Sequence, residues 1–166
     1  MGIKMKKIII MCGIAFLTSS CAISDDSKSS VPTGSSWDIT NTIEFRPRKS
    51  TVYIQDGEIV TSSWKGNQYQ AYCTIQLKTF SKNKRELKSG RFEITRVDYD
   101  NQAINETQSR YSTIMSVKSL EYPDVKEIAC HHWDDNVGDY MPVEKMQETM
   151  KGLFKLNLPD NASSSN

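Results

Sequence analysis

The chain has 166 residues, of which 37% are hydrophobic and 25% charged, a length that suits a single domain. The first 20 residues contain three lysines and no acid, so residues 21–166 carry 18 basic and 20 acidic side chains. This near balance excludes a nucleic-acid-binding protein that works through bulk positive charge. Only one apolar run is present, which excludes a membrane protein with several helical spans.

Residues 1–20 have the three parts of a secretory signal peptide. Three lysines between residues 4 and 7 form the basic part, residues 8–17 are apolar or small, and residues 18–20 are small and polar. An apolar stretch of this length is too short to cross a hydrocarbon core of about 30 Å as a helix. We therefore predict export of the chain and removal of residues 1–20.

Cys21 directly follows the signal peptide. Leu17-Thr18-Ser19-Ser20-Cys21 resembles the lipobox of bacterial lipoproteins, in which the cysteine becomes the acylated N-terminus. The family pattern has leucine three residues before the cysteine, whereas Leu17 stands four before Cys21. The alternative is ordinary signal-peptidase cleavage after Ala22, at a small-x-small triplet, which would release a soluble periplasmic or secreted protein.

Over residues 1–36 the chain resembles small Gram-negative outer-membrane lipoproteins of uncharacterised type. This resemblance implies a lipid anchor on Cys21 in the outer membrane, with the protein facing the periplasm. Residues 21–36 are polar and rich in serine, which predicts a flexible tether. Residues 160–166 have a similar composition and predict a disordered tail, which leaves residues 37–159 as the globular domain.

Cys73 and Cys130 remain once the signal peptide and the lipidated cysteine are set aside. In an oxidising compartment an even pair of cysteines predicts a disulfide. The bond would close a loop of nearly sixty residues, a stabilisation of about 4 kcal/mol in the chain-entropy model. The alternative is two separate buried thiols.

Most of residues 37–159 has the alternating or β-branched pattern of strands. Asp56-Gly57 predicts a tight hairpin turn, Asp100-Asn101 predicts another turn, and residues 81–90 predict a charged loop. The predicted strands are 51–55, 58–61, 68–80, 91–99, 110–119, 125–133 and 153–158.

Strand alternation also predicts which side chains face the core. Cys73 is expected to point into the core, on the face that it shares with Tyr69, Ala71, Ile75 and Leu77, and Phe92 and Ile94 are expected to point inward. Two further sets each share one face of their strand, and they are Tyr111, Thr113, Met115 and Val117, and Ile128, Cys130 and His132.

One helix is predicted after Pro142, which suits a first helical turn. Val143, Met146, Gln147 and Met150 recur at helical spacing, and Gly152 is a typical stop. The predicted fold is therefore mainly β, an antiparallel sandwich or partly open barrel with one short C-terminal helix.

Residues 130–135 hold both histidines of the chain beside acidic side chains. His131 and His132 are weak candidates for metal ligands, because neighbouring strand residues point to opposite faces and cannot chelate one ion together. We expect a strand end that runs into an acidic, solvated turn, with no metal and no cofactor.

Charged and aromatic side chains offer candidate partner-binding sites. We expect either two ordinary solvated surfaces or a docking site that meets anionic lipid or an acidic partner. Arg46, Arg48 and Lys49 would extend the basic surface if they lie nearby. The candidates are Lys82, Lys84, Arg85 and Lys88 in a basic loop, Asp134, Asp135 and Asp139 at an acidic end, and Trp64 in a predicted exposed loop.

No phosphate-binding glycine loop, nucleophile elbow or zinc-protease motif is present in the sequence. We therefore expect a lipid-anchored, non-catalytic module of the cell envelope that docks an envelope protein, peptidoglycan or lipid, and no nucleic acid. Two alternatives remain open. One is an envelope hydrolase that uses His131 or His132 with Asp134 or Asp135. The other is a β-barrel that binds a small ligand in its interior.

Overall fold

The structure is a computed structural model, and it describes residues 31–60, 69–135 and 138–159. The predicted signal peptide, Cys21, Trp64 and the predicted tail therefore lie outside the described residues.

Ten strands and one helix make up the described part of the chain. They are β1 (Ser36–Ile39), β2 (Ile43–Phe45), β3 (Thr51–Gln55), β4 (Glu58–Val60), β5 (Tyr72–Leu77), β6 (Arg85–Leu87), β7 (Arg91–Ala103), β8 (Gln108–Lys118), β9 (Val125–Asp135), α1 (Val143–Thr149) and β10 (Phe154–Asn157). In the described residues, no helix has the length and apolar character needed to cross a membrane.

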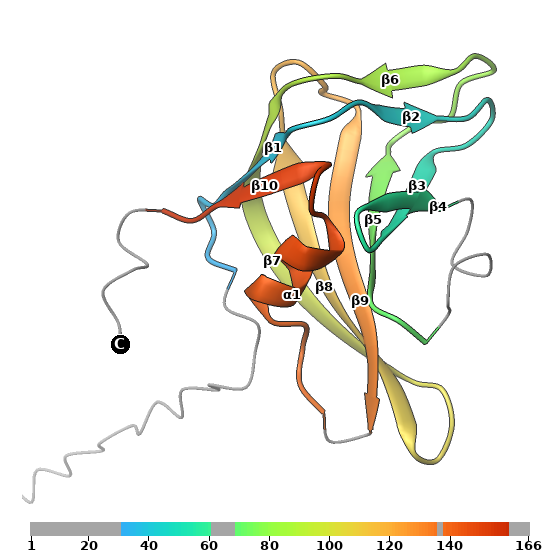
Figure 1. Ribbon diagram of the computed structural model, residues 1–166, viewed down its shortest axis with the longest axis vertical. Coiled ribbons are helices and arrows are strands. Elements are labelled where there is room, and N and C mark those ends of the chain that lie inside the picture. The colour runs from blue at the N-terminus through green and yellow to red at the C-terminus, as the bar shows by residue number, and fades with distance from the viewer. Residues whose placement is uncertain (1–30, 61–68, 136–137, 160–166) are drawn as a thin grey trace, which may run out of the picture.

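Eight strands form one antiparallel sheet in the order β10-β1-β7-β8-β9-β5-β3-β4, and β2 pairs with β6 in a small second sheet. The large sheet curls into a half-barrel, and α1 lies against its concave side (Figure 1). This confirms the predicted fold class, mainly β with one C-terminal helix. Of the two predicted architectures, the curled sheet corresponds to the partly open barrel.

The concave face of the sheet and the apolar side of α1 form the core. Ile75, Leu77 and Phe92 are buried as predicted, and Met146 of α1 is fully buried against them in the same cluster. These side chains fill the interior of the half-barrel, which argues against a ligand cavity at that place. Tyr69 is the exception to the predicted pattern, because β5 begins only at Tyr72 and the Tyr69 side chain is exposed.

The disulfide prediction is confirmed. Cys73 and Cys130 face each other across β5 and β9, and their sulfur atoms lie 2.06 Å apart in the core.

The β3–β4 hairpin closes at the predicted turn and touches the helix. Asp56 and Gly57 both have positive φ, at 52° and 79°, as a two-residue hairpin turn requires. The amide of Gly57 donates to the carbonyl oxygen of Thr149 at 2.9 Å. The end of α1 is therefore tied to the β4 edge of the sheet.

The predicted turn at Asp100-Asn101 is wrong. Both residues lie within β7, which pairs with β8 as far as Ala103 and Ser109. The turn follows at residues 104–107, where the Asn105 side chain accepts from the amides of Thr107 and Gln108. The last four residues of β7 are all exposed, so no apolar alternation marks this end of the strand in the sequence.

Two further segments differ from the prediction. The charged loop at residues 81–90 contains β6, which pairs with β2, and neither short strand was predicted. Residues 31–36, predicted as tether, pack on the sheet, with Val31 buried. The Gly34 amide donates to the Ile94 carbonyl oxygen at 2.9 Å. The folded domain therefore begins before Trp37.

Candidate functional site on the outer face of the sheet

The convex face of the sheet, opposite α1, carries a hollow over β3, β5, β8 and β9. Its volume is about 270 Å³. Aromatic, basic and hydroxyl side chains surround a small apolar floor. The lining residues are Thr51, Tyr53, Tyr72, Thr74, Gln76, Arg110, Ile114, Glu127, Ala129 and His131.

A row of side chains across three neighbouring strands forms one wall of this hollow. His131 is paired in register with Tyr72 on one side and with Ser112 on the other. The rings of Tyr72 and His131 stack with centroids 4.8 Å apart, and His131 Nδ1 lies 2.9 Å from Ser112 Oγ in a hydrogen bond. These contacts hold the imidazole in one orientation.

Burial lowers the pKa of His131 to about 4, and the positive charge of Arg110 lowers it further in the same direction. The ring is therefore neutral at neutral pH. Burial also raises the pKa of Tyr72, with the Arg110 guanidinium acting in the opposite sense. Both groups thus present uncharged hydrogen-bonding atoms to the hollow.

Arg110 supplies the positive charge of the hollow. Its guanidinium donates to Oε1 of Gln102 on β7 and is hydrogen-bonded to the Tyr72 hydroxyl, whose pKa it acts to lower. The Arg110 Nε is buried without a hydrogen-bond partner. Among the described residues, no carboxylate forms an ion pair with it. An arginine with spare donors in a partly desolvated site favours a planar anion such as a carboxylate.

Tyr53 extends the aromatic part of the hollow toward β3, with its ring centroid 6.2 Å from that of Tyr72. Thr51, Thr74, Gln76 and Glu127 add donors and acceptors beside it. This combination suits a ligand that offers carboxylate, hydroxyl and amide groups together.

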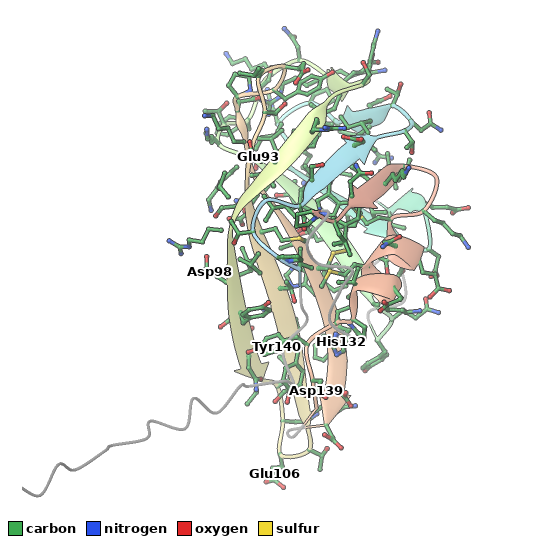
Figure 2. All side chains as sticks on the ribbon, turned by 90° about the vertical axis from the view of Figure 1, so that its left-hand side faces the viewer. Glu93, Asp98, Glu106, His132, Asp139 and Tyr140 are labelled. Atoms are coloured by element: carbon green, nitrogen blue, oxygen red, sulfur yellow. A yellow bond between two sulfur atoms is a disulfide. The ribbon has the colours of Figure 1, made fainter. Side chains whose placement is uncertain are left out.

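His132 lies on the opposite face from His131, as predicted. Its ring stacks on Tyr111 with centroids 5.8 Å apart, and Tyr140 packs edge-on against Tyr111. Figure 2 shows His132, Asp139 and Tyr140 close together in the lower half of the molecule. Burial lowers the pKa of His132, while Asp134 and Asp139 act to raise it.

The two histidines therefore cannot share a ligand. In the part of the chain that the structure describes, no group of three histidine, cysteine or acidic side chains could hold a metal ion. The contact of His131 with Ser112 resembles a nucleophile–base pair, but Ser112 is only 2% exposed. This hydroxyl is therefore largely shielded from solvent. The hydrolase alternative, in which His131 or His132 acts with Asp134 or Asp135, stays a prediction.

The predicted basic and acidic docking residues do not come together. Lys84 forms ion pairs with Glu44 and Glu86, and Arg85 pairs with Asp124, all at the end of the molecule that carries β2 and β6. The acidic residues lie at the end of β9 and beyond it, toward the opposite end, where Figure 2 labels Asp139. These residues are Asp134, Asp135 and Asp139.

Sequence reasoning missed the outer hollow. A signal was present, because Tyr53 and Tyr72 stand at outward positions of their strands among polar residues. Which strands lie side by side could not be read from that pattern. A search for matching protein families, curated proteins and solved structures found none.

Proposed function

We propose that the protein is a lipid-anchored, non-catalytic binding module of the bacterial envelope, and that the outer hollow binds peptidoglycan. The observation that carries the proposal is the guanidinium of Arg110, which lines the hollow and forms no ion pair with a carboxylate of the described residues. Of the three partner classes expected from the sequence, peptidoglycan offers carboxylates, hydroxyls and amides on one polymer. The lining residues match these groups.

Arg110 is the specificity-determining contact in this proposal. A carboxylate can take two parallel hydrogen bonds from a guanidinium, and the interaction strengthens where water is partly excluded. The stacked rings of Tyr72 and His131 provide a low-dielectric wall on one side. Thr51, Thr74 and Gln76 then form hydrogen bonds with hydroxyl and amide groups of the same ligand.

The test is co-sedimentation of the chain with purified, insoluble peptidoglycan. We expect Arg110→Gln to weaken binding at least roughly tenfold, because one charge-assisted pair contributes about 1.5–3 kcal/mol. Arg96→Gln is the matched control, since Arg96 is exposed on neighbouring β7 and is paired with Asp98. Absence of binding by the unmodified chain, or equal binding by the two variants, would overturn the assignment.

The anchor has a separate test. Mass spectrometry of the protein from bacterial membranes should find an N-terminal peptide that begins with acylated Cys21. The Cys21→Ala variant should move to the soluble periplasmic fraction. An unmodified N-terminus after Ala22 would instead establish ordinary cleavage and contradict the lipid anchor.

A further inference from the structure

Three segments far apart in the sequence meet at the end of the molecule that carries β2 and β6 (Figure 1). The amide of Arg48 donates to the Ser81 carbonyl oxygen at 2.7 Å, and the amide of Lys78 donates to the Asp124 carbonyl oxygen at 2.8 Å. We call this end the basic apex and define it as residues 44–50, 78–88 and 118–124.

The basic apex carries nine basic and four acidic side chains, a net charge of +5. Part of this charge is compensated, because Lys84 and Arg85 are held in ion pairs. Other cations form no ion pair with any described residue and are available to a partner. These are Arg46, Arg48, Lys49 and Lys82.

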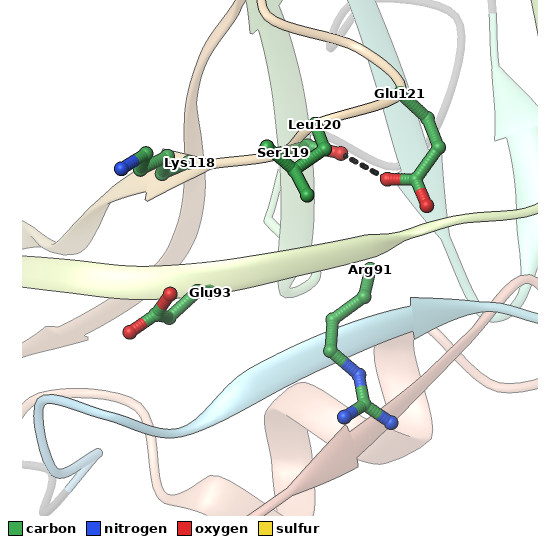
Figure 3. Close-up of a pocket in the computed structure, with 6 residues that line it drawn as sticks. All are labelled: Arg91, Glu93, Lys118, Ser119, Leu120 and Glu121. Atoms are coloured by element: carbon green, nitrogen blue, oxygen red, sulfur yellow. Dashed lines mark hydrogen bonds between the residues drawn. The ribbon is translucent and has the colours of Figure 1, made fainter.

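Two large apolar side chains project from the same apex. Phe80 is 71% exposed and Leu120 is 90% exposed. Leu120 lies at the tip of the loop between β8 and β9, beside a hollow of about 410 Å³ (Figure 3). Two basic and two acidic side chains also line this hollow, and they are Arg91, Lys118, Glu93 and Glu121. The Ser119 hydroxyl donates to the Glu121 carboxylate at 3.0 Å across the base of this tip. This hydrogen bond stabilises the turn from which the Leu120 side chain projects.

The opposite end of the molecule has the opposite charge. Residues 98–110, 134–135 and 138–139 carry six acidic side chains and one basic side chain, Arg110. Figure 2 shows Glu106 and Asp139 in this half, away from the apex. A molecule polarised in this way turns its basic end toward a negatively charged surface.

We propose that the basic apex docks on an anionic lipid surface. The unpaired lysines and arginines contact the headgroups, and Phe80 and Leu120 enter the interface between headgroups and acyl chains. Isolated exposed apolar side chains on an end with excess positive charge suit an anionic lipid surface, whereas a protein partner requires a continuous buried patch. This surface is separate from the outer hollow, so the inference does not depend on peptidoglycan binding.

The position of the first described residues is compatible with this orientation. Gly34 is hydrogen-bonded to Ile94, near the apex end of β7. Nine residues lie between Cys21 and Val31, and the ten steps of the chain from one to the other span at most about 35 Å.

The test uses the oxidised chain from Ala22 onward, because every described strand, the helix and the disulfide lie within residues 31–159. It is sedimented with vesicles of phosphatidylcholine alone or with about one-third phosphatidylglycerol. We expect at least tenfold tighter binding to the anionic vesicles, with the difference lost at about 1 M NaCl.

Two variants separate the two parts of the apex. Arg46→Gln with Arg48→Gln and Lys49→Gln should weaken binding at least roughly tenfold, given about fivefold per basic residue near a charged surface. The matched control removes three charges elsewhere, Lys145→Gln with Lys151→Gln and Lys155→Gln. Phe80→Ser with Leu120→Ser should weaken binding at least threefold, whereas Ile104→Ser, exposed in the β7–β8 turn, should not.

Equal binding to both vesicle types, or no binding to either, would overturn the inference. So would equal losses in the apex and control charge variants, because these would show a response to net charge alone. Unchanged binding of the Phe80→Ser, Leu120→Ser variant would contradict the entry of the apolar tips.

Discussion

Cys73 and Cys130 stand directly opposite each other on β5 and β9, with their Cα atoms 4.0 Å apart. The disulfide joins two central strands of the sheet, and its two cysteines are 57 residues apart in the sequence. Because it restricts the unfolded chain, we expect Cys73→Ala with Cys130→Ala to lower the free energy of unfolding by about 4 kcal/mol.

Urea unfolding of the oxidised chain and of this double variant measures the difference. Reduction of the unmodified chain should lower its stability in the same direction. A loss below about 1 kcal/mol would show that the sheet does not need the covalent link.

Because His131 is buried, we predict that the free energy of unfolding falls in acid. Its pKa is about 4 in the folded chain and about 6.5 when unfolded, so the unfolded state binds the proton more readily. The contribution of the neutral His131 ring to the free energy of unfolding is fully present above pH 6.5. It is lost as the pH falls toward 4, and the loss amounts to about 3 kcal/mol.

His131→Gln should flatten this part of the stability–pH curve, because glutamine does not titrate. His132, whose pKa is also lowered, adds a change of the same sign, so NMR titration of the two imidazoles is needed to separate them. A His131 resonance that titrates near pH 6.5 would contradict the burial argument.

Gly57 has a positive φ, and an added Cβ there would lie 2.5 Å from the Lys151 carbonyl oxygen. Gly152 also has a positive φ, but nothing would lie within 4 Å of its Cβ. Gly152→Ala therefore costs only the strain of a positive φ in alanine, about 1–2 kcal/mol of stability. Gly57→Ala carries the same strain, and its added Cβ must also push the hairpin away from the end of α1.

We expect Gly57→Ala to be the more destabilising of the two by at least about 1 kcal/mol in thermal or urea unfolding. Equal losses would mean that the hairpin and the end of α1 separate without cost.

The exposed apolar tips of the basic apex should contribute little to folding. Phe80→Ser with Leu120→Ser should change the free energy of unfolding by less than about 0.5 kcal/mol per site. Phe92→Ala, which removes a fully buried ring, should cost about 3–5 kcal/mol. Urea unfolding checks both, and a large loss in the tip variant would indicate that these side chains pack inside the domain.

The sequence predicted the strands that have one buried and one exposed face. It did not predict the very short strands or the strand end that is exposed on both faces. The alternation around Ile75, Met115 and Ile128 predicted the side that faces the core, because a half-buried strand repeats every two residues. β2 and β6 have three residues each, too few for a period to show. The far end of β7 has no buried face, so its extension beyond Tyr99 was missed.

The sequence by itself determined the mainly β class, most of the inward residues and the Asp56-Gly57 hairpin, because each depends on local periodicity or turn chemistry. The cysteine pair followed from the number of cysteines left after the signal peptide and the lipidated residue. Tertiary structure alone decided that β8, β9, β5 and β3 are neighbours, which brings Arg110, His131 and Tyr72 into one hollow. It also decided that residues 44–50, 78–88 and 118–124 share one end. The outward pattern of a strand is the same whichever strand lies beside it, and long-range pairing sets that neighbour.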